Sequence, residues 1–200
     1  MKKRETIVVF DFDGTITRKD TLLEFIKFSK GNLRFYFGLM LFSPLIIAMK
    51  LKIFPNWKIK QSLFSYFYKD VSIEEFNKWG KKFSFEIDKI VRPKAIETLK
   101  FHKKNGDKVV IISASIENWI TFWAKKTGVD TVLATKIEIN EESVLTGKFL
   151  TKNCYGQEKV NRLLAEFPNR SEYKLIAYGD SRGDKELIDF ADEGYYNKFI

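Results

Sequence analysis

The sequence predicts an α/β fold: a doubly wound parallel β-sheet with an all-helical segment inserted after its first strand. Residues 7–10 are an apolar, β-branched run, typical of a strand buried in a parallel sheet. Beyond residue 90, similar runs alternate with amphipathic helical segments, as in doubly wound sheets. The residues between show almost only helical periodicity. We therefore expect an α/β core of residues 1–17 and 90–200, and a helical cap of residues 18–89.

Capping residues and prolines delimit the helices of the insertion. Asp20 is a suitable N-cap for the first of them. A strongly apolar segment, residues 33–49, follows it, and we expect Pro44 to break or kink that helix. Two more helices are expected to begin at Pro55 and after Ser72, which opens a capping box.

The expected elements of the core alternate along the chain. The strands are residues 108–113, 132–135 and 174–178, with an antiparallel hairpin of 136–140 and 144–148. The helices are residues 93–104, 116–127, 157–166 and 185–190.

Composition narrows the functional classes. Cys154 is the single cysteine, which excludes an internal disulfide and a four-cysteine metal site and suits a reducing cytosol. The net charge of +9 favours anionic partners, but the lysines are scattered and no nucleic-acid motif is present, so a nucleic acid is not expected. The basic N-terminus precedes a short apolar run that meets two aspartates, so we expect no signal peptide and a cytoplasmic protein. We expect His102, at a helix end, to be solvated rather than catalytic.

Polar side chains stand at the ends of several core elements. These are Asp11 and Asp13 after the first strand, Ser113 at the end of the second, Lys159 near a helix start, and Asp180 and Asp184 after residues 174–178. Because the carboxyl ends of parallel strands share one edge of a sheet, we expect these side chains to gather there.

Together these residue types suit hydrolysis of a phosphate monoester. The substrate dianion repels an attacking carboxylate, so Mg²⁺ and a lysine must supply positive charge. Asp11 and Asp180 are suitable Mg²⁺ ligands, with Asp184 orienting them. Ser113 and Lys159 would hold the phosphoryl oxygens. One aspartate would attack phosphorus, and a second acid would protonate the leaving oxygen and then activate water.

These residues resemble the four motifs of the haloacid dehalogenase superfamily of phosphohydrolases. The motifs are Asp11-Phe12-Asp13-Gly14-Thr15, Ser113, Lys159 and Gly179-Asp180-Ser181-Arg182-Gly183-Asp184. The helical insertion resembles the cap of the phosphoserine-phosphatase-like subgroup, subfamily IB. The resemblance implies a Rossmann-like core and an aspartyl-phosphate intermediate, and it implies the following roles. Asp11 is the nucleophile and Asp13 the general acid/base; Asp11, the Asp13 main-chain carbonyl and Asp180 bind Mg²⁺; Ser113 and Lys159 bind phosphate; Asp184 supports the metal site.

The sequence departs from phosphoserine phosphatases at the substrate side. Gly183 stands where those enzymes usually carry asparagine, and residues 35–70 contain no arginine. Asp20 is a shortened version of the glutamate that holds the serine group, which makes it a candidate specificity residue. Phosphoserine phosphatase therefore stays an alternative within the enzyme class.

The apolar cap segment bears on the substrate and on membrane contact. Residues 35–49 are uncharged and flanked by lysine and arginine, so the segment either lies in an anionic membrane interface or packs within the cap against Trp57 and Phe64. Its pattern and residues 151–159 also resemble C-type phosphatidylglycerophosphate phosphatases, which implies a phospholipid headgroup. The expected partner is thus an anionic phosphorylated small molecule, with contact of residues 33–53 with the inner membrane face left open.

A non-catalytic, receiver-like phosphate sensor is the alternative outside the enzyme class, because such proteins also place acidic clusters at strand ends. The inserted cap favours the enzyme, since a cap can exclude water around a substrate.

Overall fold

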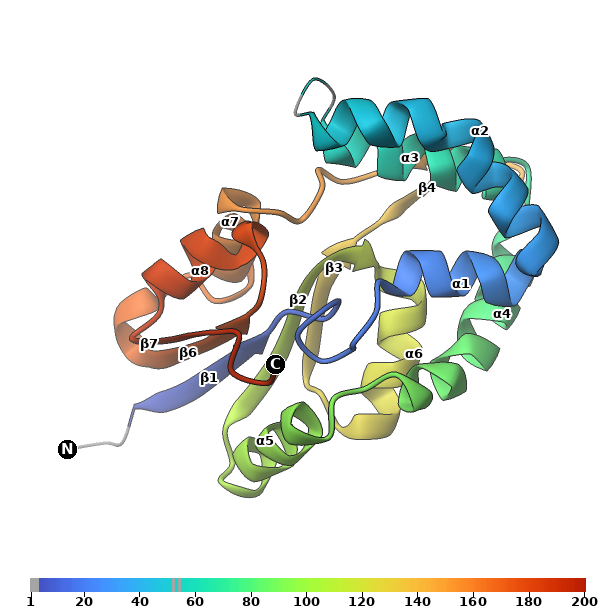
Figure 1. Cartoon of the computed structure of the whole chain (residues 1–200). Helices are drawn as coiled ribbons and strands as arrows, with labels where there is room; N and C mark the ends of the chain where they lie inside the picture. The colour runs from blue at the N-terminus through green and yellow to red at the C-terminus, as the bar shows by residue number, and fades with distance from the viewer. Residues whose placement is uncertain (1–3, 52, 54) are drawn as a thin grey trace.

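The computed structural model describes residues 4–51, 53 and 55–200, and its centre is a five-stranded parallel sheet (Figure 1). The strand order is β3-β2-β1-β6-β7, so the first strand lies in the middle. These strands are β1 (Glu5–Phe10), β2 (Lys108–Ile116), β3 (Thr131–Thr135), β6 (Tyr173–Gly179) and β7 (Glu193–Tyr196). A separate antiparallel hairpin consists of β4 (Ile137–Ile139) and β5 (Leu145–Phe149). The predicted α/β fold is confirmed; β7, which has no strong apolar run, was not predicted.

Helices cover both faces of the sheet and form the insertion. The insertion holds α1 (Thr21–Lys30), α2 (Asn32–Lys50), α3 (Asn56–Tyr68) and α4 (Ile73–Glu86). The core helices are α5 (Pro93–Lys104), α6 (Glu117–Thr127), α7 (Gln157–Glu166) and α8 (Lys185–Phe190), with short 3₁₀ turns at Ile87–Lys89, Arg170–Glu172 and Arg182–Asp184.

Alternate residues of β1 belong to different hydrophobic cores, as the period of two in a strand requires. Val8 and Phe10 pack with α5, α6 and the insertion. Ile7 and Val9 pack with α7 and α8 on the opposite face. Figure 1 shows α7 and α8 together on one side of the sheet, away from α5 and α6. The central strand is therefore buried on both faces, which explains its continuous apolar run.

The chain leaves and re-enters the core at one place. Thr17 and Val91 form an isolated antiparallel bridge, flanked by the hydrogen bonds from Arg18 N to Ile90 O (2.8 Å) and from Arg92 N to Ile16 O (2.7 Å). This crossing lies close to the boundaries that we propose between core and cap, residues 17/18 and 89/90.

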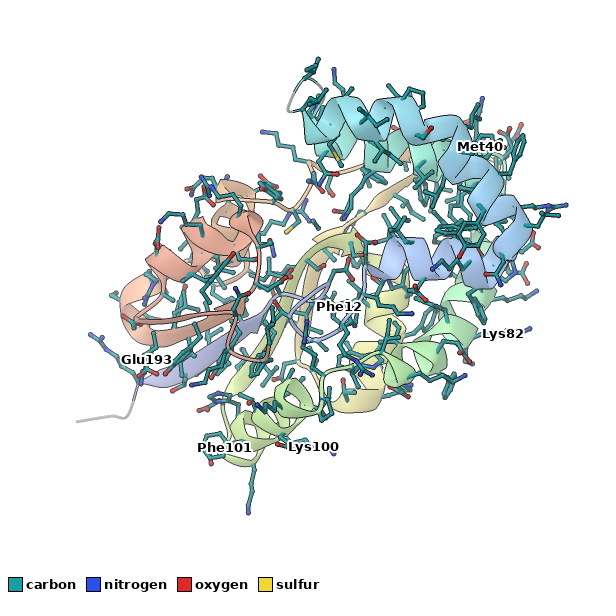
Figure 2. The ribbon with its side chains drawn as sticks, viewed as in Figure 1. Phe12, Met40, Lys82, Lys100, Phe101 and Glu193 are labelled. Atoms are coloured by element: carbon teal, nitrogen blue, oxygen red, sulfur yellow. The ribbon has the colours of Figure 1, made fainter. Side chains whose placement is uncertain are left out.

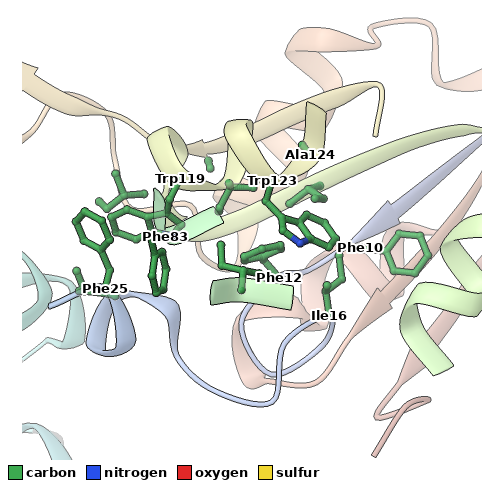
Figure 3. Close-up of a cluster of buried hydrophobic side chains, with 14 of the residues drawn as sticks. Phe10, Phe12, Ile16, Phe25, Phe83, Trp119, Trp123 and Ala124 are labelled. Atoms are coloured by element: carbon green, nitrogen blue, oxygen red, sulfur yellow. The ribbon is translucent and has the colours of Figure 1, made fainter. Parts of the chain in front are cut away.

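An aromatic cluster joins the insertion to the core. Phe25 of α1 stacks on Trp119 of α6 with ring centroids 4.5 Å apart, and Phe83 of α4 meets the same indole edge-on at 6.2 Å (Figure 3). Phe12, directly after β1, contacts Trp123 on the next turn of α6 (5.3 Å). The insertion and the sheet thus share one hydrophobic core instead of having one each.

Of the expected break or kink at Pro44, the break is wrong, because Asn32–Lys50 form one helix with Pro44 inside it. The Met40 carbonyl, to which the proline has no N–H to donate, accepts a hydrogen bond from Ser43 Oγ at 2.8 Å. The expectation for His102 is also wrong. His102 is not solvated: it is 6% exposed, and its ring nitrogens lie 2.8 Å from Asp107 Oδ2 and 3.2 Å from Tyr178 Oη.

Candidate active site

A cavity of about 530 Å³ lies at the carboxyl ends of the central strands, beneath the helices of the insertion. Its polar wall comes from the core and its apolar wall from α1, α2 and α3. The lining includes Asp11, Asp13, Asp20, Leu23, Leu39, Ile46, Met49, Ile59, Lys60, Leu63, Ser113, Asn153, Tyr155, Lys159, Ser181 and Gly183. The strand ends that carry the motif residues thus meet at one edge of the sheet, as expected for parallel strands.

Asp11 stands directly beyond β1, where its backbone N–H donates to the Tyr178 carbonyl of the neighbouring strand (2.9 Å). The residue is 5% exposed, and Oδ1 accepts a hydrogen bond from Lys159 Nζ at 2.6 Å. The same ammonium, itself 2% exposed, also donates to Asp184 Oδ1. Lys159 therefore lies between two carboxylates that come from opposite ends of the chain.

Burial and this ion pair act in opposite directions on the three groups. Burial raises the pKa of Asp11 to about 7, although the Lys159 charge works against the rise. Burial also disfavours the charge on Lys159, yet Asp11 and Asp184 hold the pKa of the ammonium above its ordinary value. For Asp184, burial is outweighed by Lys159 and by hydrogen bonds from Ser181, so its pKa is lowered. Lys159 therefore remains charged, whereas Asp11, with a pKa of about 7, is partly protonated near neutral pH.

Asp180 brings a third carboxylate to the cluster. One oxygen each of Asp11, Asp180 and Asp184 lies within 4.8 Å of the others, and burial raises the pKa of Asp180. Thr15 Oγ1 donates to Asp180 Oδ1 at 2.8 Å. Gly14, with φ of +89°, makes room for Asp180, because a Cβ there would lie 2.2 Å from Asp180 Oδ2. Carboxylate oxygens gathered at this spacing fit a small, hard divalent cation.

The two carboxylate oxygens of Asp13 have different surroundings. Oδ1 accepts hydrogen bonds from Thr21 N (3.0 Å) and Thr21 Oγ1 (2.6 Å). Oδ2 is buried and has no hydrogen-bond partner among the described residues. Burial raises the pKa of Asp13 to about 6; the charge of Asp20 adds to the rise, and that of Lys60 opposes it. A proton is thus most easily carried on Oδ2, the oxygen with no internal donor.

Thr21 is part of a short buried hydrogen-bond network that holds Asp13 in place. Its single hydroxyl hydrogen is given to Asp13, so it must accept from Ser115 Oγ (2.9 Å) and from Trp119 Nε1 (3.1 Å). Sequence reasoning missed Thr21 and Ser115. The available signal was that Thr21 follows the N-cap Asp20, because backbone N–H groups at a helix start point out of the helix.

Ser113 lies on β2 where its pairing with β3 becomes irregular, between Ser113 and Ile116. It is 1% exposed, lines the cavity, and accepts a hydrogen bond from Ser115 N at 3.0 Å. The irregular strand end thereby presents a hydroxyl next to the Asp11 loop.

The insertion contributes a mostly apolar wall with two charges. Asp20 acts as the N-cap of α1, accepting from Leu22 N (2.9 Å) and Leu23 N (3.1 Å), as predicted. Its other oxygen lies 3.9 Å from Lys60 Nζ on α3. Sequence reasoning also missed Lys60 as a site residue. Its positive charge lowers the pKa of Asp13 and so opposes the effect of burial.

The contact with Tyr155 explains why position 183 is a glycine. A Cβ at Gly183 would lie 2.5 Å from the Tyr155 ring, so only glycine lets that ring lie against the turn before α8. Tyr155 is 45% exposed and lines the cavity mouth beside Asn153. The departure from asparagine at position 183 therefore goes together with an aromatic side chain at the rim.

Comparisons with known proteins agree with this architecture. The chain matches the haloacid dehalogenase-like hydrolase family over residues 8–189. It is 30% identical over 197 residues to Protein CicA of Caulobacter vibrioides, covering 96% of this chain and 86% of that protein. Among solved structures, a protein of unknown function from Bordetella pertussis Tohama I has a TM-score of 0.81 at 16% identity, covering 94% of this chain and 87% of that one.

A substrate-bound phosphoserine phosphatase has a TM-score of 0.65 at 20% identity, with 98% of this chain and 86% of that one covered. At such identity the likeness concerns the fold: a parallel sheet with helices inserted between β1 and β2. The family match, by contrast, spans the strand ends that form the cavity, from the β1 loop to α8. This protein belongs to the haloacid dehalogenase-like hydrolase family.

Proposed function

We propose that the protein is a Mg²⁺-dependent phosphatase that hydrolyses a phosphoric monoester through an aspartyl-phosphate on Asp11. The observation that carries the proposal is the pairing of Asp11 with Lys159 at 2.6 Å inside the cavity, beside the carboxylates of Asp180 and Asp184. The proposal thus rests on a buried carboxylate, a buried cation and a cluster of further carboxylates that lie together.

Asp11, Asp180 and the main-chain carbonyl of Asp13 would hold the Mg²⁺ ion, with Asp184 supporting them. The donor set fits, because Mg²⁺ prefers oxygen ligands and takes few carboxylates. When bound, the ion supplies positive charge that lets a carboxylate approach a phosphate dianion.

The chain's own groups account for the remaining chemistry. Ser113 and Lys159 hold the phosphoryl oxygens while the Asp11 carboxylate attacks phosphorus and the bond to the ester oxygen breaks. Asp13, with a pKa of about 6, gives its proton to the leaving oxygen. The Asp13 carboxylate then takes a proton from a water molecule, which attacks the phosphorus of the aspartyl-phosphate. Inorganic phosphate leaves and Asp11 is regenerated.

The cap wall favours a leaving group with apolar character. Leu39, Ile46 and Met49 face the cavity, and the two charges of this wall, on Asp20 and Lys60, lie 3.9 Å apart and pair with each other, whereas the zwitterionic group of phosphoserine would need charged partners of its own. Asp20, the candidate specificity residue, lies beside Lys60 and caps α1. We therefore favour a small phosphorylated metabolite or a phospholipid headgroup over phosphoserine. As the sequence led us to expect, we also propose that the enzyme is cytoplasmic.

The decisive variant is Asp11→Asn. We expect turnover of p-nitrophenyl phosphate to fall to background while the circular dichroism spectrum is unchanged. The matched control is Asp189→Asn, an exposed carboxylate on α8 that pairs only with Lys185 among the described residues and should retain activity. Retained turnover in Asp11→Asn would remove Asp11 from the role of nucleophile.

Metal removal and trapping distinguish an enzyme from a phosphate sensor. EDTA should abolish turnover and Mg²⁺ should restore it. Mass spectrometry of the acid-quenched enzyme should find a phosphoryl adduct on the peptide that contains Asp11, and the adduct should decay at the rate of turnover. A stable adduct without turnover would favour the receiver-like alternative.

A further inference from the structure

Helix α2 is apolar on two opposite faces, but only one face is covered by protein. The inner stripe packs on the insertion and the cavity; it consists of Phe35, Leu39, Phe42, Ile46 and Met49. The outer stripe repeats with the same spacing; it consists of Leu33 (87% exposed), Phe37 (55%), Met40 (63%) and Ile47 (59%), and Leu51 (65%), directly after the helix, continues it. A helix that is apolar all round belongs in a protein core or against lipid. Here the outer stripe lies against solvent.

The geometry of α2 favours a helix that lies on a membrane over one that crosses it. By length and composition Asn32–Met49 could span a bilayer, with a mean hydropathy of 1.4, and 11% of that window is buried. However, its inner stripe is tied to the fold: Phe35 is 3% exposed, and a Cβ at Gly38 would lie 2.4 Å from the Phe67 ring of α3. Crossing a bilayer would separate these contacts. Figure 1 shows α2 along the outside of the molecule, with α3 between it and the hairpin.

A basic groove adjoins the outer stripe at the start of α2. It has a volume of about 560 Å³ and is lined by Lys30, Leu33, Arg34, Phe37, Tyr66 and Phe67. Within the described parts of the chain, no carboxylate lies within ion-pair distance of the Lys30 or Arg34 side chain, whereas Lys30 Nζ lies 4.3 Å from the Trp79 ring centre. Glu75 acts on Lys30 only through its charge, without forming an ion pair with it. Two cations that form no ion pair among the described residues, beside an apolar stripe, complement a surface that is anionic outside and apolar beneath.

We propose that the outer face of α2, together with this groove, docks on the surface of an anionic phospholipid bilayer with the helix axis parallel to the membrane. Phe37, Met40 and Ile47 enter the interface, and Lys30 and Arg34 contact lipid phosphates. This extends the proposed function, because the opposite side of the same helix lines the catalytic cavity. The docking itself does not depend on catalysis.

Co-sedimentation with vesicles tests the docking. Wild-type protein should pellet with vesicles of equal parts phosphatidylglycerol and phosphatidylcholine and stay in the supernatant with phosphatidylcholine alone. The double variant Phe37→Ser/Met40→Ser should bind at least tenfold more weakly, and Arg34→Gln should bind several-fold more weakly, with a smaller salt dependence.

Matched controls come from α5, on a different part of the surface. Phe101 is 60% exposed and Lys100 is also exposed, and Figure 2 shows both far from Met40. Phe101→Ser and Lys100→Gln should bind vesicles as the wild type does. Equal loss in these controls, or no binding of the wild type to anionic vesicles, would overturn the proposal.

Two further readouts separate the remaining explanations. Sedimentation velocity without lipid should show the same monomer for the wild type and Phe37→Ser/Met40→Ser; a dimer that the variant dissociates would make the face an interface between copies. All four variants should keep the wild-type rate with p-nitrophenyl phosphate in solution. Vesicle binding without turnover would refute only the proposed function, and turnover without vesicle binding would refute only the docking.

Discussion

Asp13 shows how single hydrogen bonds set the chemistry of this site. Thr21 holds Oδ1 through two donors, and Oδ2 is left free to carry a proton. Because hydrogen bonds to the charged form lower the pKa of a carboxyl group, Thr21 partly offsets the effect of burial. Thr21 is therefore a positioning residue rather than a catalytic one.

Replacing Thr21 by valine tests this role. Thr21→Val keeps the backbone donor but loses the hydroxyl donor, so the pKa of Asp13 should rise. In the proposed mechanism Asp13 is protonated when the leaving group departs, so the alkaline limb of the kcat/KM profile should move to higher pH, with kcat lowered by roughly tenfold. Thr21→Ser should restore the wild-type profile. A uniform loss of activity with an unshifted profile would show that Thr21 is only structural.

Gly14 is a second position where one atom matters. In Gly14→Ala, the added methyl group would meet Asp180, and alanine also disfavours a φ of +89°. We expect a loss of roughly 1–3 kcal/mol in the free energy of unfolding and Mg²⁺ binding at least tenfold weaker, measured by calorimetry. Gly106→Ala is the control, since it has a similar φ of +77° but no neighbour within 4 Å of its Cβ. Equal metal affinity in both variants would contradict the close approach of Asp180.

At the scale of elements, the insertion is clamped from two sides. Its α1 and α4 share the aromatic cluster around Trp119, and α3 meets the hairpin, where Phe149 N donates to Gln61 Oε1 at 3.0 Å. A rigid-body swing of the whole cap would have to break the cluster.

The clamp predicts that cap and core unfold together. Phe83→Ala removes a ring that is 2% exposed and should lower the free energy of unfolding by roughly 3–5 kcal/mol. Tryptophan fluorescence and far-ultraviolet circular dichroism should still report one coincident transition in urea. Phe85→Ala, at a ring that is 58% exposed, should change stability by less than about 1 kcal/mol. Two separate transitions would show that the cap is an independent unit.

At the scale of the whole molecule, folding gathers the carboxyl groups of Asp11, Asp13, Asp180 and Asp184 at one edge of the sheet, and burial makes the ionisation of the first three less favourable. Burial raises the pKa of Asp11 to about 7 and that of Asp13 to about 6, both above the unfolded value of 3.8. A carboxyl group with a raised pKa in the folded state stabilises the protein below its unfolded pKa and loses that contribution as the pH rises through the folded value. The charge of Lys159 limits the rise in the pKa of Asp11 but does not abolish it.

Metal-free protein should therefore lose stability between about pH 4 and pH 7. We expect its Tm, in EDTA, to fall over this range, and we expect Mg²⁺ to raise the Tm more at pH 7.5 than at pH 5 because the ion favours ionised ligands. Asp13→Asn should flatten part of the decline while keeping the bond from Thr21 N. A metal-free Tm that rises from pH 5 to pH 7.5 would contradict the raised pKa values.

Sequence alone determined much of the local structure and pointed to the hydrolase family. Asp20, Ser72 and Gly128 set helix ends through short-range hydrogen bonds and a left-handed backbone, so those ends could be predicted to within a residue or two. The order of the motif residues likewise predicted which strand ends would meet. Only the tertiary structure decided that His102 is buried, that Thr21 holds Asp13, and that the outer stripe of α2 lies uncovered. Each of these depends on contacts between residues distant in sequence, or on which face of a helix packs against a partner. The hydrophobic periodicity of a sequence contains neither kind of information.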